Sequence, residues 1–371
     1  MNDIAALRSD PLDALAKARA VFFLAPSSHI GSIHMPQVLV ECRQRFPGIR
    51  LVAVDDMYHA APGMVEGYDQ ILPVADYVGE PHSVAVNCGH LLATWLYFDH
   101  LAKARQGSVI DLPELLYAFD MVLVYQNGKT TRAQTLEHAE RFSALKRRFA
   151  DAHSVDTLDA VLRMRMTGDR AHLLDVICPS EQEYFSMYRS ELTPITLHDS
   201  EHYVDIGAYD GDTLRKFLTA ARHRYRSIHA FEPDPSNFAA LQQRMGSVPG
   251  PIFLHNQAVG NSDQPLSFSA KGNMGSRVEV GGDIQVPSVR LDDVLDEITL
   301  LKMDVEGFEA QVLLGGAQVI GRCRPRMAIT CYHHALDLLD IVAVLDRIYP
   351  DARLRLRHYA MFFYDTILYV E

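Results

Sequence analysis

A Gly-rich turn in the middle of the chain is surrounded by acidic side chains. The sequence VDIGAYDGDT at 204–213 places Gly207 and Gly211 in the turn, after an expected strand and before an amphipathic run. Glycine lets the backbone approach a ligand closely, and the first turn of a helix offers free amide groups. Glu232 follows the turn by about 20 residues, at the expected tip of the next strand, where a carboxylate accepts both hydroxyls of an adenosine ribose. The pattern predicts a site for an adenosine-containing ligand.

The charge of this turn distinguishes between adenosine ligands. Asp205, Asp210 and Asp212 lie around it, where they would repel a pyrophosphate. S-adenosylmethionine carries a sulfonium and an ammonium group and no phosphate, so the acidic turn favours it over NAD or ATP. A Gly-rich turn that merely links a strand to a helix is the alternative, and the acidic residue at the next strand tip, Glu232, argues against it.

A second group of ionisable residues, in LKMDVEG at 301–307, stands at the carboxyl end of another expected strand, where ligands bind in open α/β sheets. Methyl transfer to a hydroxyl is an in-line displacement that removes the acceptor proton at or near the transition state. Asp304 is therefore the candidate base or acceptor-orienting group, with Lys302 beside it. The sequence requires no metal; if a divalent ion is used, Asp304 and Glu306 are its candidate ligands. The alternative is structural: Glu306 or Glu309 caps the next helix, and Lys302 pairs with a carboxylate.

Further candidates follow other strands. His333 comes after the strand ITCY and is a competent base for a hydroxyl held by Asp304; alternatively, it packs against the sheet. The Gly-bounded segment GNMGSR at 272–277 predicts an acceptor loop. The candidate acceptor-binding residues, including one at the strand tip, are Asn273, Ser276, Arg277 and Glu306. Arg277 would suit a carboxylate or phosphate on the acceptor.

Composition places the chain among globular proteins with more than one core. It has 371 residues, 48% of them hydrophobic, which is enough for two ordinary domains. The formal net charge of −12 argues against a nucleic-acid partner or an anionic membrane surface, since both need clustered positive charge. The chain shows neither a basic leader with an apolar core nor an apolar run of roughly 18 residues, so we expect a cytoplasmic protein. The five scattered cysteines predict buried free thiols.

Alternating strand and helix patterns predict an α/β protein in three parts. Residues 1–110 predict a smaller Rossmann-like domain, 111–180 a mainly helical bridging segment, and 181–371 a doubly wound domain. The expected strands of the first part are at 21–25, 51–56 and 83–87. Arg353, Arg355 and Arg357 alternate along a late strand and share a face, which more often is solvent-exposed than a ligand surface.

The first part contains only a weak phosphate-loop pattern. In the turn PSSHIG at 26–31, Pro26 and Ile30 stand where glycines would allow close approach to a phosphate. A Rossmann-like shell without a cofactor is therefore the preferred interpretation. A nucleotide at Gly31 and Asp55 is a minority hypothesis.

Taken together, the motifs of the last part resemble the FkbM family of S-adenosylmethionine-dependent methyltransferases. They are VDIGAYDGD at 204–212, FEP at 231–233, AVG at 258–260, LKMDVEGFE at 301–309, YHH at 332–334 and DTILY at 365–369. The resemblance extends from the region of Glu181 to the last residue. More loosely, the N-terminal half is similar to a Rossmann-type extension that precedes some members of the family.

The resemblance implies a seven-stranded Rossmann-like methyltransferase fold and methyl transfer to an oxygen of a sugar, polyketide or other small metabolite. It places the methionine end of the cofactor at the Gly-rich turn, the ribose at Glu232, and the adenine beside Gln257 and Ala258. The expected cofactor-binding residues are Asp205, Gly207, Ala208, Tyr209, Gly211, Asp212, Glu232, Gln257 and Ala258. The expected catalytic residues are Asp304, His333 and Lys302. By its position alone, Asp212 would also serve as a helix cap.

Two other functions remain open at this point. One is a nucleotide-dependent oxidoreductase or sugar-modifying enzyme that uses the N-terminal part, and the other is a protein that binds S-adenosylmethionine without catalysis. The expected partner is a small-molecule acceptor such as a sugar or glycan, with no nucleic acid and no membrane. A homo-oligomer is compatible with the sequence.

Overall fold

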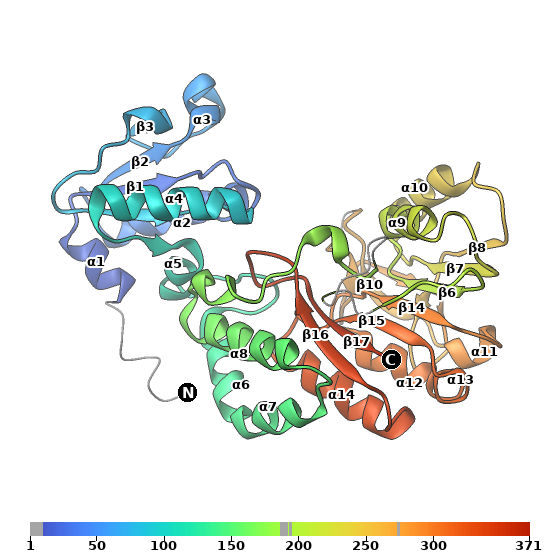
Figure 1. Cartoon of the computed structure of the whole chain (residues 1–371). Coiled ribbons are helices and arrows are strands. Elements are labelled where there is room, and N and C mark those ends of the chain that lie inside the picture. Colours follow the sequence, from blue (N-terminus) through green and yellow to red (C-terminus); the bar gives the residue numbers. More distant parts are fainter. Residues whose placement is uncertain (1–9, 186–191, 193–194, 273–274) are drawn as a thin grey trace. The chain divides into compact units, whose positions relative to one another are not determined.

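The chain divides into two compact units. The computed structural model describes residues 10–185, 192, 195–272 and 275–371. Close contacts group residues 1–137, 159–177 and 360–363 into a first unit. Residues 138–158, 178–359 and 364–371 form a second unit. Figure 1 shows the helices and strands of both units.

The first unit is built on a five-stranded parallel sheet in the order β3-β2-β1-β4-β5. The strands are β1 (Ala20–Leu24), β2 (Arg50–Val54), β3 (Gln70–Leu72), β4 (Ser83–Asn87) and β5 (Ile110–Asp111). The central strand β1 is buried along its whole length, and such continuous apolar runs are typical of parallel strands covered on both faces. The predicted Rossmann-like N-terminal architecture is therefore present, with two short strands that the sequence did not suggest.

Helices and short 3-10 turns connect the strands of the first unit. They are α1 (Pro11–Lys17), α2 (His29–Arg45), α3 (Asp56–Ala60), η1 (Pro62–Met64), η2 (Val74–Asp76), α4 (Leu92–Gln106), α5 (Leu112–Ala118), α6 (Gly128–Glu137) and η4 (Arg170–Leu173). The long helix α4 lies across one face of the sheet (Figure 1).

Gly31 and Asp55 have structural tasks in the turn after β1. A Cβ on Gly31 would lie 2.5 Å from the carbonyl oxygen of Pro26, so only glycine lets α2 begin so close to the turn. The Asp55 carboxylate accepts hydrogen bonds from the amides of Ser27, at 3.0 Å, and of Met57 and Tyr58, at 3.0 and 3.1 Å. Asp55 thus caps the first turn of α3 and ties it to the turn after β1.

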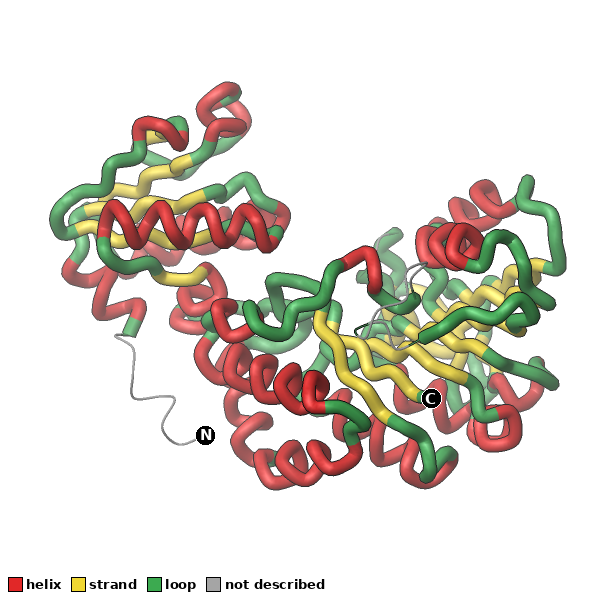
Figure 2. Tube along the Cα trace, viewed as in Figure 1, coloured by secondary structure: helices red, strands yellow, loops and turns green. Residues whose placement is uncertain are grey.

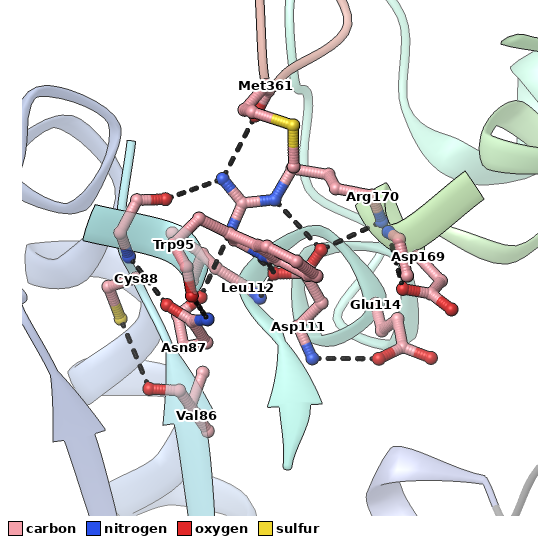
Figure 3. A network of polar contacts seen from close by, with 12 residues as sticks. Val86, Asn87, Cys88, Trp95, Asp111, Leu112, Glu114, Asp169, Arg170 and Met361 are labelled. Carbon is pink, nitrogen blue, oxygen red and sulfur yellow. Dashed lines mark hydrogen bonds and ion pairs between the residues drawn. The ribbon is translucent and has the colours of Figure 1, made fainter. Parts of the chain in front are cut away.

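A buried arginine joins several elements of the first unit (Figure 3). Arg170 is fully buried, and its guanidinium contacts both oxygens of Asp111, at 2.5 and 2.8 Å. It also donates to the carbonyl oxygens of Asn87, Gly89 and Met361. Because a buried charge is costly unless it is paired and hydrogen-bonded, this network fixes the ends of β4 and β5.

The segment expected to bridge the two domains is helical but is shared between the units. It contains α5, α6, α7 (Ala139–Leu145), η3 (Lys146–Arg148), α8 (Ala152–Thr167) and η4. Residues 138–158 belong to the second unit and 159–177 to the first. Among the described residues, no helix is both long and apolar enough to cross a membrane.

The second unit contains the expected seven-stranded sheet, with its strands in the order β16-β17-β15-β14-β6-β7-β8. Its strands are β6 (His202–Ile206), β7 (Ser227–Phe231), β8 (Ile252–His255), β14 (Leu300–Met303), β15 (Arg326–Thr330), β16 (Leu354–His358) and β17 (Thr366–Val370). The neighbouring strands β8, β7, β6, β14 and β15 pair in parallel, whereas β17 is antiparallel to both of its neighbours. The chain runs outward from β6 to β8 and then returns to β14, so the strand order reverses between β6 and β14. In open α/β sheets, ligands bind at this reversal, beyond the carboxyl ends of the strands.

Helices lie on both sides of this sheet, with α9 and α10 on one side and α12, α13 and α14 on the other (Figure 2). The helices are η5 (Ser180–Gln182), α9 (Asp212–Ala220), α10 (Pro235–Met245), α11 (Leu291–Val294), α12 (Glu309–Gly315), α13 (Ala317–Cys323) and α14 (Asp337–Ile348). Helix α9 buries Leu214 and Phe217, and the Phe217 ring stacks on Tyr203 of β6 at 4.2 Å between centroids. Such apolar packing holds the helix that follows the Gly-rich turn against the sheet.

Between β8 and β14 the chain forms small sheets instead of a long helix. Their strands are β9 (Ala258–Val259), β10 (Leu266–Ser269), β11 (Arg277–Val278), β12 (Ile284–Val286) and β13 (Ser288–Val289). These strands surround a small cluster of Ala258, Phe268 and Val286. The expected acceptor loop belongs to this region.

Of the three arginines expected to share an exposed face, Arg353 is exposed, Arg355 is partly buried and Arg357 is buried, so the expectation is wrong for Arg357. Arg357 is 1% exposed and donates to Asp151 at 2.8 Å and to the hydroxyl of Ser154 at 2.9 Å. Residues far away in the sequence neutralise its charge, a pairing that strand alternation alone does not reveal. The five cysteines are free thiols, and all except Cys323 are buried.

Candidate functional site: a pocket at the carboxyl edge of the second sheet

A pocket of ≈ 260 Å³ lies at the predicted edge of the second unit. Its walls include the residues that follow β6, β7, β8 and β14 and the residue that precedes β17. Of the residues expected to bind cofactor, those that line it are Gly207, Tyr209, Asp212, Glu232, Gln257 and Ala258. Of the expected catalytic and acceptor residues, those that line it are Lys302, Asp304, Glu306, Ser276 and Arg277. The structure thus brings both predicted motifs to one cavity.

The Gly-rich turn is held in place by the strands on either side of it. Gly207 has φ +77°, and a Cβ there would lie only 1.8 Å from the carbonyl oxygen of Asp304. The amides of Gly207 and Ala208 both donate to the carbonyl of Phe231 at 3.0 Å. Gly211, with φ +88°, is the N-cap position of α9. Asp212 is therefore the first residue of the helix, not its cap.

The three aspartates of the turn have different surroundings. Asp205 is fully buried beneath the turn, where it accepts from the Tyr203 hydroxyl at 3.0 Å and lies 3.2 Å from Lys302 Nζ. Asp210 pairs with Arg244 at 2.6 Å. Only Asp212 lines the pocket. Local cations therefore neutralise two of the three charges on which the sequence argument relied.

Lys302 supports the turn from the strand β14. Its ammonium donates to the carbonyl of Gly207 at 2.8 Å as well as contacting Asp205. Burial opposes its charged form, but Asp205 and Asp304 outweigh that effect and raise the pKa of Lys302. Lys302 thus pairs with a carboxylate, as the structural alternative predicted.

Glu232 stands at the tip of β7 with both carboxylate oxygens oriented by backbone amides. Oε2 accepts from the Tyr209 amide and Oε1 from the Asp234 amide, both at 2.9 Å. Burial raises the pKa of Glu232 to about 7, although these two amides favour the ionised form. A carboxylate held in this way can accept further hydrogen bonds from a ligand in the pocket.

The expected acceptor loop is hydrogen-bonded to Asp234, two residues after Glu232. Asp234 Oδ2 accepts from the hydroxyl of Ser276 at 2.7 Å and from the amide of Gly272 at 3.0 Å. Burial opposes ionisation of Asp234, but bonds from Ser236, Ser276 and Gly272 lower its pKa to about 2. Arg277 pairs with Glu279 at 2.5 Å. Asn273, also expected here, lies outside the described residues.

Asp304 occupies the loop directly after β14, opposite Gly207. Its Oδ2 accepts from the Tyr184 hydroxyl at 3.2 Å, and its Oδ1 lies 3.3 Å from the Thr330 hydroxyl oxygen, which is closer to Glu309. Its amide donates to the carbonyl of Ile206 at 3.0 Å, which ties the loop to β6. The orientation of the Asp304 carboxylate is therefore fixed, and Asp304 lines the pocket.

His333 lies behind Asp304 and is not part of the pocket wall. It is 2% exposed, with Nε2 3.4 Å from Asp304 and 3.3 Å from Glu306, and Nδ1 3.4 Å from Glu309. Burial opposes its charged form, but Glu309, Glu306 and Asp304 together raise its pKa well above the usual value. The structure brings His333 and the predicted carboxylates into one cluster.

Glu309 has a local structural task in that cluster. Its Oε1 accepts from the amides of Val305 at 3.1 Å and Gly307 at 3.4 Å, and from the hydroxyl of Thr330 at 2.9 Å. It thus satisfies amides of the loop that leads into α12, close to the capping role given as the alternative. Glu306, in the same loop, has φ +61° and lines the pocket.

The pocket also contains residues that were absent from the predicted site. Glu183, Tyr332 and Asp365 line it. Tyr184, which the sequence suggested for a cofactor or substrate wall, lines it as well. Asp365 precedes β17, and because β17 runs antiparallel, the start of that strand lies where the parallel strands end. That topology was the signal that could have identified Asp365. Glu183 follows a short 3-10 turn and has no local pattern that indicates a site.

Comparison with known proteins connects this site to a family. The model of the methyltransferase FkbM domain matches residues 205–350. The 2-O-methyltransferase NoeI of Sinorhizobium fredii is 27% identical over 147 residues, which cover 33% of this chain and 59% of NoeI. The hexuronic acid methyltransferase AglP of Haloferax volcanii is 24% identical over 127 residues, 32% of this chain and 52% of AglP. The match thus spans little more than half the length of these curated relatives.

A solved structure shares the architecture of the whole chain. The methyltransferase FkbM from Methylobacillus flagellatus KT superposes with a TM-score of 0.77 at 23% identity, covering 100% of this chain and 96% of that one. This likeness shows a common fold that includes the N-terminal unit. Residues 205–350, which include the turn after β6 and the loop after β14, therefore carry a methyltransferase FkbM domain.

Proposed function

We propose that the protein transfers the methyl group of S-adenosylmethionine to a hydroxyl of a small, sugar-like acceptor. The observation that carries the proposal is Glu232, whose oriented carboxylate lines the same pocket as Asp304. Glu232 would hold a ribose, and Asp304 would hold an acceptor. The names of NoeI and AglP, a 2-O-methyltransferase and a hexuronic acid methyltransferase, support an acceptor of the sugar class.

The residues of the pocket suit the chemistry of S-adenosylmethionine. Glu232 would accept the ribose hydroxyls, Gln257 and Ala258 would border the adenine, and the turn at Gly207 and Tyr209 would receive the methionine end. When bound, the cofactor supplies a methyl group on a positively charged sulfur. Carboxyl groups on the pocket wall favour that charge, and the two lining cations lie beside carboxylates of their own. The donor set fits a cationic cofactor better than a pyrophosphate.

Asp304 is the group that would receive the acceptor proton. Methyl transfer requires the acceptor oxygen in line with the methyl carbon and loss of its proton at or near the transition state. The Tyr184 hydroxyl donates to Oδ2 of Asp304 and orients the carboxylate without help from the acceptor. His333 lies behind Asp304 and would stabilise its charge, which makes His333 a positioning residue, and Lys302 would position the turn.

A divalent ion is compatible with the same cluster but is not required. Among the described residues, ligand atoms of Asp304, Glu309 and His333 lie within 4.8 Å of one another. This set differs from the predicted pair because it replaces Glu306 with Glu309 and His333. An ion held there would lower the pKa of an acceptor hydroxyl.

Calorimetric titration tests the cofactor assignment before any acceptor is known. We expect S-adenosylmethionine and its demethylated product to bind and NAD not to bind, with or without magnesium. Glu232→Gln removes the ionised acceptor of the ribose hydroxyls and should weaken binding roughly 10- to 100-fold, since hydrogen bonds to charged groups contribute about 1.5–3 kcal/mol. Glu297→Gln, the same change at a side chain that is 63% exposed, is the matched control. Binding of NAD alone, or unchanged affinity in Glu232→Gln, would contradict the proposal.

Asp304→Asn separates catalysis from cofactor binding. The amide keeps the shape of the side chain but cannot take up a proton. We expect cofactor affinity within a few-fold of the parent and methyl transfer reduced about 10²- to 10⁴-fold, the usual contribution of a positioned base. The assay follows labelled methyl groups from the cofactor into the acceptor panel described below. Full turnover in Asp304→Asn would show that another group accepts the proton.

A further inference from the structure

The acceptor end of the pocket is strongly acidic. The carboxyl residues that line the pocket are Glu183, Asp212, Glu232, Asp304, Glu306 and Asp365. In the described part of the wall, the lysines and arginines that face them are Lys302 and Arg277. Glu232 and Asp212 lie on the side assigned to the cofactor. The remaining four carboxyl groups lie around the loops after β14 and before β17, where the acceptor would meet the methyl group.

Both lining cations are already engaged with carboxylates. Lys302 lies 3.2 Å from Asp205 and donates to the Gly207 carbonyl at 2.8 Å. Arg277 pairs with Glu279 at 2.5 Å and adjoins Ser276, which is bonded to Asp234 on the cofactor side. An anionic acceptor would therefore have to break one of these pairs or remain close to several carboxylates. Either event opposes its binding.

Two of the acceptor-side carboxyl groups are suited to hydroxyl groups. Burial and the neighbouring Asp365 raise the pKa of Glu183 to about 8, against the opposing effect of Lys216. Burial and Asp304 raise the pKa of Asp365 to about 7. A protonated carboxyl group both donates and accepts hydrogen bonds, as a sugar hydroxyl does. The Tyr184 and Tyr332 side chains complete this part of the wall.

We propose that the acceptor is an electrically neutral, hydroxyl-rich glycoside, and that Glu183, Asp304, Glu306 and Asp365 discriminate against uronates and sugar nucleotides. This inference rests on the proposed function and deepens it by naming the charge of the acceptor. It assigns this chain a neutral hydroxyl acceptor rather than a hexuronic acid. It also replaces the expectation that Arg277 receives an acceptor carboxylate or phosphate.

The experiment compares acceptors that differ only in charge. The complex of the full chain with S-adenosylhomocysteine is titrated with methyl glucoside, methyl glucuronide and UDP-glucose, and with the galacto and manno counterparts of each, by ligand-observed NMR. The same panel is offered with labelled S-adenosylmethionine. We expect at least one neutral glycoside to bind and accept methyl, and its uronate and nucleotide counterparts to bind roughly 10- to 100-fold more weakly, as a repelling charge about 6 Å away predicts.

The pH dependence of this discrimination tests the assigned residues. Glu183 faces Asp365, Asp304, Lys216 and Lys302, and Asp365 faces Asp304 and His333. As the pH rises from 6 to 9, Glu183 and Asp365 ionise, so the preference for the neutral glycoside over its uronate should increase. The double variant Glu183→Gln, Asp365→Asn should flatten that increase while keeping affinity for S-adenosylhomocysteine, and Glu297→Gln should behave as the parent.

Each outcome decides the proposal. A preference for the uronate or nucleotide overturns it, and a discrimination that is unchanged between pH 6 and 9 overturns the roles assigned to Glu183 and Asp365. Binding of S-adenosylhomocysteine without binding of any neutral glycoside overturns the acceptor class but leaves the cofactor assignment intact. Failure of S-adenosylhomocysteine to bind removes the proposed function and this inference with it.

Discussion

Glu183, Glu232 and Asp365 are carboxyl groups whose pKa values the fold raises towards neutral pH. Burial is the first cause in each case, and it raises their pKa values to about 8, 7 and 7. Ionising such groups in the folded state is costly because water no longer solvates the charge. Carboxyl groups with strongly shifted pKa values often lie in ligand-binding sites, where the bound molecule forms hydrogen bonds with them.

These pKa values predict how stability depends on pH. The three groups hold protons in the folded state that the unfolded chain releases near pH 4, so stability should fall as the pH rises from 5 to 8. Glu183→Gln removes one of these groups and should raise the melting temperature at pH 8 by about 2–4 °C, with little change at pH 5. Scanning calorimetry of the ligand-free protein measures the effect. Parallel pH profiles of Glu183→Gln and the exposed control Glu297→Gln would contradict the assignment.

At the scale of elements, the site depends on how closely the turn after β6 meets the loop after β14. The Gly207 Cα lies so near the Asp304 carbonyl that no side chain fits between them. The same turn is bonded to β7 through the Phe231 carbonyl and to β14 through Lys302. Three strands therefore hold the turn at Gly207 and the loop at Asp304 together.

Gly207→Ala should separate these two loops. Gly281→Ala is the matched control, because Gly281 also has a positive φ, of +81°, but nothing lies within 4 Å of an added Cβ. We expect the control to lose about 1–2 kcal/mol of stability from its left-handed backbone alone and to keep cofactor affinity. Gly207→Ala should lose more stability and bind S-adenosylmethionine at least tenfold more weakly. Calorimetric binding and thermal melts measure both; equal behaviour of the two variants would show that the close approach is unimportant.

At the scale of the whole molecule, each unit has its own sheet and its own core. The single tryptophan of the chain, Trp95, belongs to the first unit and donates to Asp111 at 3.0 Å. It therefore lies beside the buried pair of Arg170 and Asp111 (Figure 3). Its fluorescence reports on the first unit, whereas cofactor binding reports on the second.

Loss of the buried Arg170 pair should destabilise the first unit strongly. Arg170→Met leaves Asp111 as an uncompensated buried charge, which costs about 3–5 kcal/mol and lowers the midpoint of the Trp95 transition by on the order of 10 °C. Arg324→Met breaks a pair whose side chains are 56% and 58% exposed and should cost no more than about 1 kcal/mol. Thermal melts followed by fluorescence make the comparison. A Trp95 transition that is equally stable in both variants would contradict the role assigned to this network.

The sequence by itself determined the turn at Gly207 and Gly211, the carboxylate of Glu232 and the group at Asp304. These residues follow strands whose apolar patterns are local, and parallel strands present their carboxyl ends at one edge, so spacing alone was enough to predict that they meet. The same patterns predicted the α/β fold of both halves, and the resemblance to the FkbM family implied a seven-stranded sheet; the structure confirms both.

Only the tertiary structure decided which charges face the pocket. Asp205 and Asp210 looked like cofactor-facing groups, yet Lys302 and Arg244 pair with them, while Arg357 is buried against Asp151. Asp365 enters the pocket because the last strand is antiparallel. Ion pairs and burial depend on residues that are distant in the sequence, and their energies depend on exclusion of water, so neither composition nor local spacing could reveal them.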